Sequence, residues 1–314
     1  MATLVYHAGA LGDFITTLPA LRYWKRQKPG ERQVLLGKPA FGELARESGV
    51  IHGLLDLDDR RCLPLFYEQF SPEAATLLGP FSEAVIFSDT DSPLVKNIRA
   101  SGIERIHAQP PFPKQKIHAV DYHLSLFADT AALSMEERTP RIAISQKATK
   151  ASYAIIPVDH PFITIHSGSG SLKKNWPFKR FLEIADSLRQ KGFAIAWLKG
   201  PAEEDRSFPA GDTVVHNQSL SVIAGLLSRS ALFIGNDSGI THLAAAVNCP
   251  TVALFGPSDP VVWAPRGASV TVIRKQMACA PCHRVDKSGD ACDRECMTGI
   301  CGDEVVQAIS AIIR

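Results

Sequence analysis

Three loops of this sequence combine small residues with charged side chains in a way that suits the binding of an anion. They are Gly9-Ala10-Leu11-Gly12-Asp13, residues 166–177 (HSGSGSLKKNWP) and residues 235–246 (GNDSGITHLAAA). Glycine and serine leave backbone N–H groups and hydroxyls free to surround phosphate oxygens, and lysine neutralises their charge. The second and third loops are therefore predicted to bind phosphate, and the first places a carboxylate at the start of a helix.

Each loop also has a plainer interpretation. The G-x-x-G spacing of the first loop does not match the G-x-G-x-x-G fingerprint of dinucleotide sites, and Asp13 on its own would be an acid that stabilises a helix N-terminus. The second loop alone would read as a flexible linker with solvated lysines, although its position between a strand and a helix argues against that. His242 either donates to phosphate oxygens or merely packs.

The elements that must position these loops follow from the hydrophobic pattern. Short apolar runs alternate with amphipathic segments of helical length, which is typical of βαβ units with mostly parallel sheets. Ligands of such sheets bind beyond the carboxyl ends of the strands, where the three loops begin. Strands are expected at 4–6, 34–36, 54–55, 84–87, 162–165, 194–197, 214–215, 232–234 and 252–255. Helices are expected at 14–25, 178–190, 220–227, 240–247 and 303–313.

The length of 314 residues favours two domains, at about 150 residues each. We expect them at 1–150 and 151–314, because residues 141–161 are polar, lack a sustained period and end in two prolines. The composition is that of a globular protein, and a net charge of only +2 argues against a nucleic-acid partner. The N-terminal residues do not resemble a signal peptide, and no apolar run approaches the roughly 18 residues of a membrane span, so a cytoplasmic location is expected.

Five of the seven cysteines crowd into the loop 277–301. The spacing Cys279-x2-Cys282-x9-Cys292-x3-Cys296 is compatible with four thiolates around a structural zinc or iron ion. Reduced thiols or a disulfide pair remain alternatives, because spacing alone over-predicts metal sites.

Taken together, the motifs resemble glycosyltransferase family 9, the heptosyltransferases that build the inner core of lipopolysaccharide. The resemblance covers nearly the whole chain and implies a GT-B fold, in which two Rossmann-like domains with mostly parallel sheets face each other across a cleft. It implies that the first domain binds an acceptor and the second a nucleotide-sugar donor. The most specific pieces are Gly9-Ala10-Leu11-Gly12-Asp13, Lys174-Asn175-Trp176-Pro177, Asn236-Asp237-Ser238-Gly239 through His242, and Gly256-Pro257-Ser258-Asp259-Pro260.

The resemblance further implies an inverting transfer of heptose from ADP-heptose to a sugar hydroxyl, with no cofactor needed for catalysis. Asp13 corresponds to the proposed general base, Lys174 to the lysine that meets the donor phosphates, and Asp237 to an acid near the donor sugar. The resemblance assigns the remaining donor or phosphate contacts to Gly9, Gly12, Ser169, Gly170, Glu203, Ser238, Gly239, Thr241 and His242. One departure concerns the acceptor, because the family usually has an arginine before the first glycine loop and this chain has His7-Ala8.

The expected partners are an ADP-sugar donor and a lipid-linked or glycan acceptor, which would bring the protein to the cytosolic face of the inner membrane as a peripheral protein. Two other functions are compatible with the same residues. One is a sugar-nucleotide epimerase of GT-B fold, and the other is a non-catalytic nucleotide-binding or scaffold protein whose four cysteines form a metal knuckle.

Overall fold

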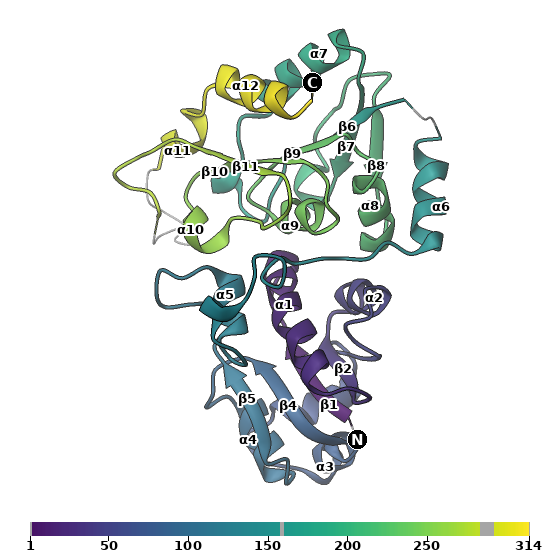
Figure 1. The fold of residues 1–314 in the computed structure, drawn as a ribbon, viewed down its shortest axis with the longest axis vertical. Helices are drawn as coiled ribbons and strands as arrows, with labels where there is room; N and C mark the ends of the chain where they lie inside the picture. Colours follow the sequence, from purple (N-terminus) through teal and green to yellow (C-terminus); the bar gives the residue numbers. More distant parts are fainter. Residues whose placement is uncertain (1, 158–159, 283–291, 314) are drawn as a thin grey trace. The chain divides into compact units, whose positions relative to one another are not determined.

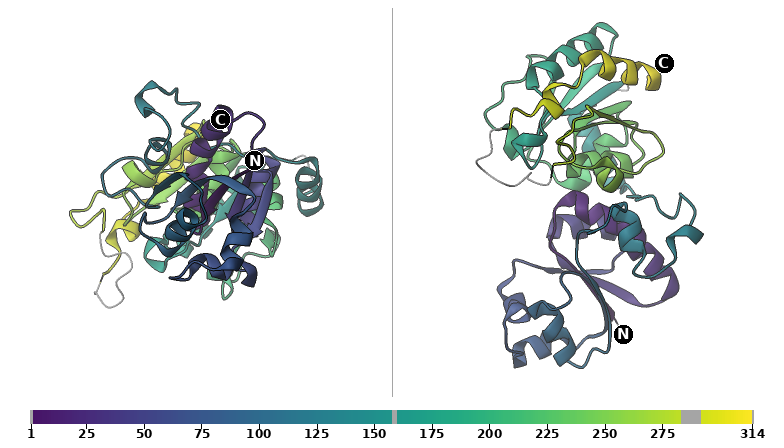
Figure 2. Two further views of the ribbon diagram at one scale, coloured as in Figure 1. Left: turned by 90° about the horizontal axis from the view of Figure 1, so that it is seen from below. Right: turned by 90° about the vertical axis from the view of Figure 1, so that its left-hand side faces the viewer.

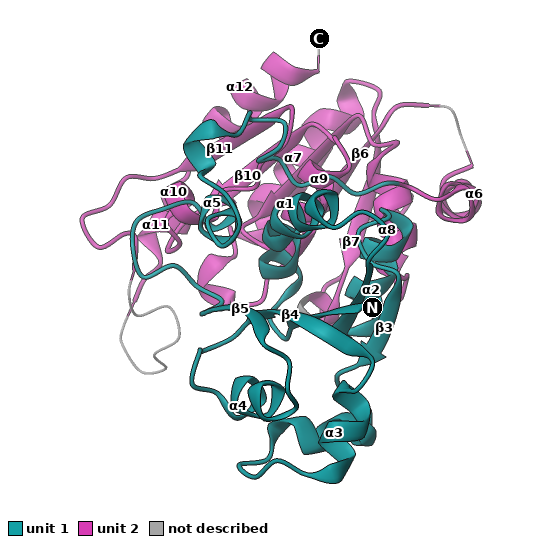
Figure 3. Ribbon diagram, turned by 60° about the horizontal axis from the view of Figure 1, so that its bottom comes forward, with its two compact units in different colours: residues 1–143 teal, residues 144–314 magenta. Residues whose placement is uncertain are grey.

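The chain forms two compact α/β units, residues 1–143 and 144–314, each built on one parallel sheet (Figure 3). A computed structural model describes residues 2–157, 160–282 and 292–313. No helix in these described ranges is both long enough and apolar enough to cross a membrane.

The first unit has a five-stranded sheet in the order β3-β2-β1-β4-β5, with every pair parallel. Helices cover both faces of the sheet, so its strands are apolar on both sides. The strands are β1 (Ala2–His7), β2 (Arg32–Gly37), β3 (Gly53–Asp56), β4 (Phe81–Phe87) and β5 (Arg105–Gln109). On one face lie α1 (Leu11–Gln27), α2 (Pro39–Glu47) and α5 (Ala119–Leu124), and on the other lie α3 (Pro72–Leu78) and α4 (Pro93–Ala100) (Figure 1).

Helix α1 begins at Leu11, within the first loop. Its buried side includes Ile15, Leu18 and Leu21, which confirms the amphipathic helix expected there, although the helix is longer than 14–25. The carboxylate of Asp13 lies in the first turn and accepts the backbone N–H of Ala10 at 3.0 Å. The acid therefore stabilises the start of the helix, as its position predicts.

The second unit has a six-stranded parallel sheet in the order β11-β10-β9-β6-β7-β8. Helices α7 (Phe178–Gln190) and α12 (Gly302–Ile312) lie side by side on one face, as Figures 1 and 2 show, and α6 (Gln146–Ile155), α8 (Leu220–Leu227) and α9 (Gly239–Ala246) lie on the other. The strands are β6 (Phe162–His166), β7 (Ala194–Lys199), β8 (Thr213–His216), β9 (Leu232–Asn236), β10 (Thr251–Phe255) and β11 (Val270–Arg274). The short helices are α10 (Pro260–Trp263) and α11 (Glu295–Thr298).

Three segments differ from the sequence-based expectation. The expected linker 141–161 contains α6, which packs on α8 and whose N-cap Ser145 accepts the N–H of Ala148 at 3.2 Å. Its buried positions are the small residues Ala148 and Ser152, so the hydrophobic period is weak. Strands β5 and β11 were not expected, because both are edge strands that are only partly buried.

Both sheets contain a point at which the strand order reverses. In the first unit β1 and β4 are neighbours, and in the second unit β6 and β9 are neighbours, so the connections leave in opposite directions on either side of these pairs. Loops at such a switch point splay apart at the carboxyl ends of the strands and leave room for a ligand. The loops after β1, β6 and β9 are the three that the sequence singles out.

Candidate functional site

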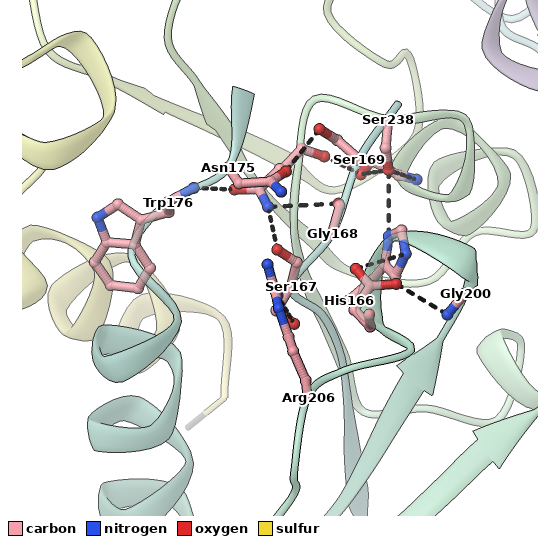
Figure 4. Close-up of polar contacts among 12 residues, drawn as sticks. His166, Ser167, Gly168, Ser169, Asn175, Trp176, Gly200, Arg206 and Ser238 are labelled. Carbon is pink, nitrogen blue, oxygen red and sulfur yellow. Dashed lines mark hydrogen bonds and ion pairs between the residues drawn. The ribbon is translucent and has the colours of Figure 1, made fainter. Parts of the chain in front are cut away.

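Asn236, the last residue of β9, joins the two loops at the switch point of the second sheet. Its side chain is fully buried, the amide nitrogen donates to the carbonyl of Ser167 at 2.8 Å, and the amide oxygen accepts the N–H of Trp176 at 3.0 Å (Figure 4). Because Trp176 is itself buried in the core, this bridge fixes the loop after β6 at both of its ends. The loop that carries Lys174 therefore has a defined position relative to β9.

Lys174, Asp237 and His242 come together at this edge. The ammonium of Lys174 lies 2.8 Å from the carboxylate of Asp237, and both charges influence the imidazole of His242. His242 is buried, which lowers its pKa, and it makes a hydrogen bond to the backbone of Trp263. A paired lysine at the start of α9 gives a cationic group that can meet a bound phosphate.

The start of α9 is held by Ser238 and Thr241. Ser238 is the N-cap residue and its hydroxyl accepts the N–H of Thr241 at 3.4 Å. The hydroxyl of Thr241 donates to the carbonyl of Asn236 and the residue is fully buried, so it fixes the turn from inside. Gly239 is the first helical residue. The N–H groups at the first positions of a helix have no partner within the helix, which suits them to an anion.

Glu203 lies beside the loop after β6 and is almost fully buried. One carboxylate oxygen, Oε2, accepts the N–H of Gly200 at 2.9 Å, while Oε1 has no hydrogen-bond partner in the described part of the chain. Burial raises the pKa of this carboxyl group. The carboxylate packs against Gly168, where a methyl group would lie 1.3 Å from Oε1, so only glycine leaves room for it.

The other small residues of this loop behave differently. The hydroxyl of Ser169 makes a 2.7 Å hydrogen bond to the side-chain oxygen of Asn175, which closes the loop on itself. Gly170 is exposed, and nothing lies within 4 Å of the position that a methyl group would take. Ser167 accepts a 2.6 Å hydrogen bond from Arg206. The glycine that is needed sterically is thus Gly168, whereas the phosphate contact expected of Gly170 stays a prediction.

Asp13, Gly9 and Gly12 belong to the first unit and lie where its sheet has its switch point. A methyl group at Gly9 would lie 3.0 Å from the ring of His7 and 3.1 Å from the carboxylate of Asp13, so the glycine lets these two side chains approach each other. His7 is buried against Phe14 and Phe87. Burial, together with the charge of Lys38, lowers its pKa to about 4, so it is neutral at physiological pH.

All five cysteines of the loop 277–301 lie in the described part of the chain, which omits residues 283–291. Cys296 is buried in the core, whereas Cys279 and Cys292 are exposed and Cys282 is half-buried. The other three thiols are near enough to contribute to the raised pKa of Cys296, of which burial is the largest cause. Within the described ranges, no group of three or more His, Cys, Asp or Glu side chains has an arrangement that would hold a metal ion.

The second unit therefore brings together most of the predicted donor-side residues around one sheet edge. Two residues that belong to this edge were not among the predicted site residues, namely Asn236 and His166. The signal that could have found them is a polar residue at the carboxyl end of an otherwise apolar strand, because such a residue is buried and points to where a ligand binds.

The comparisons with known proteins agree with this architecture. Lipopolysaccharide heptosyltransferase 1 of Pseudomonas aeruginosa is 24% identical over 309 residues, which cover 90% of this chain and 86% of that protein. The structure of Escherichia coli ADP-heptose lipopolysaccharide heptosyltransferase II superposes with a TM-score of 0.75 at 17% identity, covering 99% of this chain and 98% of the other. The E. coli heptosyltransferase WaaC with ADP gives a TM-score of 0.66 at 19% identity, covering 99% and 100%.

The fold is therefore GT-B. The family model for glycosyltransferase family 9 (heptosyltransferase) matches residues 105–291, which is more than half of the chain. The chain therefore belongs to glycosyltransferase family 9, and the protein is a glycosyltransferase. This membership favours a transferase over the two alternatives, the epimerase and the non-catalytic scaffold protein.

Proposed function

We propose that this protein transfers a heptose from ADP-heptose to a sugar hydroxyl of the lipopolysaccharide core or a related glycan, with inversion at the anomeric carbon. The observation that carries the proposal is the pairing of Lys174 with Asp237 at the N-terminus of α9, at the switch point of the second sheet. The names of the similar proteins, which concern ADP-heptose and lipopolysaccharide, support this donor and this class of acceptor.

On the donor side, the diphosphate would lie at the start of α9. Backbone N–H groups of the first helical turn and the ammonium of Lys174 would neutralise the charge that develops on the departing ADP. Asp237 holds the ammonium in place at 2.8 Å and lies beside the expected sugar position. Glu203 would face the nucleotide side. These protein groups supply the stabilisation of the leaving group in the proposed reaction, so no cofactor is invoked for catalysis.

On the acceptor side, Asp13 would act as general base. The acceptor oxygen forms a bond to the anomeric carbon while its proton passes to the carboxylate of Asp13. The bond between that carbon and the phosphate oxygen breaks, and its electron pair leaves with ADP. Attack on the face opposite the leaving group gives inversion. The proposal places this chemistry in the cytoplasm, with a lipid-linked acceptor that would bring the protein to the inner membrane.

The decisive experiment follows heptose transfer by mass spectrometry after substitution of Asp13. Asp13→Asn should keep its fold and its affinity for ADP and should lose transfer by about 100-fold or more, because a missing general base costs that much. Asp129→Asn is a matched control, since Asp129 also caps a short helical segment in the first unit but lies outside the site. Full turnover of Asp13→Asn would show that Asp13 is not the base.

The donor is tested separately. Purified protein is incubated with ADP-, GDP- and UDP-sugars, and the melting temperature is recorded for each. ADP-heptose should give the largest increase, because at equal concentration the ligand that binds the folded state most tightly stabilises it most. A larger increase with a guanine or uracil nucleotide would contradict the proposed donor.

A structural zinc or iron ion at Cys279, Cys282, Cys292 and Cys296 stays a prediction. It is tested by measuring bound metal in protein purified without added chelator. About one equivalent of metal that disappears in Cys279→Ser would support it, and metal-free protein of full stability would contradict it. No step of the proposed reaction depends on the outcome.

A further inference from the structure

His166 lies at the end of β6 between two groups of the candidate donor site. His166 as a whole is 8% exposed. The ring nitrogen Nδ1 lies 3.4 Å from the hydroxyl of Ser238, and Nε2 lies 3.8 Å from Oε1 of Glu203 (Figure 4). The imidazole thus stands between the N-cap of α9, where the phosphates are proposed to bind, and the carboxylate proposed for the nucleotide side.

The protonation of this ring follows from its surroundings. Burial and the nearby guanidinium of Arg206 lower the pKa of His166 to about 4, so the ring is neutral and has one N–H and one lone pair. The hydroxyl of Thr241 donates to the carbonyl of Asn236 and lies 3.0 Å from the hydroxyl of Ser238, so the proton of Ser238 is directed to Thr241. The ring nitrogen Nδ1 of His166 then carries the proton and donates to the oxygen of Ser238, while Nε2 keeps its lone pair on the side of Glu203.

This arrangement has a consequence at each end. The oxygen of Ser238 accepts from Nδ1 of His166 and from the N–H of Thr241, which fixes the N-cap of α9. At the other end, burial raises the pKa of Glu203, and Oε1 of its carboxyl group has no hydrogen-bond partner in the described part of the chain. A protonated Oε1 that moves a few tenths of an ångström toward Nε2 would donate to the lone pair of that nitrogen. One ring can therefore hold both groups.

We propose that His166 is a positioning residue of the donor site, whose two ring nitrogens orient the N-cap Ser238 for the diphosphate and Glu203 for the nucleoside. The inference rests on the proposed function, since it takes the ligand to be a nucleoside diphosphate. It assigns the two ends of the ring to two different parts of that ligand, which makes them separable by experiment.

Asparagine and glutamine distinguish the two nitrogens, because the asparagine amide reaches the position of Nδ1 and the glutamine amide reaches that of Nε2. The full-length variants His166→Asn and His166→Gln are compared with wild type by calorimetric titration with ADP and with inorganic pyrophosphate. His166→Asn should bind pyrophosphate like wild type and ADP about 5- to 10-fold more weakly. His166→Gln should bind pyrophosphate about 5- to 10-fold more weakly, as expected for the loss of one hydrogen bond.

The outcomes separate the two proposals. If wild type binds ADP and both variants lose the same factor for both ligands, or lose nothing, His166 only packs and the inference is wrong. If wild-type protein binds neither ADP nor pyrophosphate, the proposed function is wrong and the inference falls with it. Melting temperatures of the ligand-free variants show whether a loss of affinity is instead a loss of fold. A variant that melts at the wild-type temperature and shows the ligand-specific loss supports the inference.

Discussion

The carboxylate of Glu203 occupies the space that a side chain at Gly168 would need, since a methyl group there would lie 1.3 Å from Oε1. The two residues are 35 positions apart in the sequence and come from the loops after neighbouring strands β6 and β7. A larger side chain at position 168 therefore cannot be accommodated unless Glu203 moves. The glycine of this loop therefore sets the position of a buried carboxylate, and its role is not flexibility.

Gly168→Ala should displace Glu203 and weaken ADP binding. Overpacking of this kind also costs about 1 to 3 kcal/mol of stability. Gly170→Ala is the matched control, because nothing lies within 4 Å of the added methyl group, and it should leave melting temperature and affinity unchanged. In the double variant Gly168→Ala/Glu203→Ala the clash is gone, so stability should recover while ADP affinity stays low. If Gly168→Ala has the melting temperature and ADP affinity of wild type, the loop can shift to accommodate the methyl group without a measurable cost.

Lys174→Met should lower the rate of transfer by about 100-fold or more, as is typical when one group that stabilises transition-state charge is removed. Lys174→Arg keeps the charge beside Asp237 and should retain more activity. Steady-state rates with saturating acceptor measure both effects. Equal loss in the two variants would mean that the exact position of the ammonium matters more than its charge, and wild-type rates in Lys174→Met would exclude a role for it.

Asn236→Asp should destabilise the second unit by about 1 to 3 kcal/mol. The substitution replaces the amide N–H₂ that donates to the carbonyl of Ser167 with an acceptor, and so sets two acceptors against each other in a fully buried place. Urea unfolding measures the change. Asn217→Asp, at an exposed position, is the control and should have little effect. If both variants unfold alike, the bridge between the two loops contributes nothing measurable.

The first unit should lose stability as the pH falls from about 6.5 toward 4. Burial lowers the pKa of His7 to about 4 and that of His123 to about 3, below the usual 6.5. As the pH falls below 6.5, both histidines therefore become protonated in the unfolded chain while they stay neutral in the folded protein. The stability that each neutral histidine contributes is complete above pH 6.5. Between pH 7 and pH 5 each should account for a loss of about 2 kcal/mol.

Urea unfolding at pH 7 and pH 5 tests this pH dependence. His123→Phe removes one of the two groups, so its loss on acidification should be about 2 kcal/mol smaller than that of wild type. His216→Asn, at an exposed position, should lose as much as wild type. Identical losses in wild type and His123→Phe would mean that His123 is protonated in the folded protein as readily as in the unfolded chain.

The sequence predicts the fold well wherever a strand is buried on both faces, because such strands are continuous apolar runs. Residues 178–190 are helical as expected, since they have a clear amphipathic period, and the nearly all-apolar residues 220–227 are also helical as expected. Edge strands such as β5 escape prediction because their residues are polar and half-exposed. Helix α6 escapes because it buries only small residues against α8.

The sequence indicates which loops form the candidate site, but it does not indicate which side chains contact each other there. Small residues after a strand reveal where a ligand can approach, so the loops that contain Lys174 and Asp237 are evident from the sequence. The contact between Gly168 and Glu203 is not evident, because it depends on the pairing of two strands and on one rotamer. The same holds for His166, whose importance comes from what lies on its two sides.

Residues 294–300 of the cysteine-rich segment contact the loop after β6, which carries Lys174. The carbonyl of Ile300 accepts the indole N–H of Trp176 at 3.2 Å, Arg294 donates to the carbonyl of Leu172 at 3.0 Å, and Met297 packs against Gly256. The loops after β6 and β10 therefore both pack against one short stretch of chain. Oxidation or alkylation of Cys296, which is buried in that stretch beside Gly256, would displace the loop that carries Lys174 without touching any residue that is assigned a role in the proposed reaction.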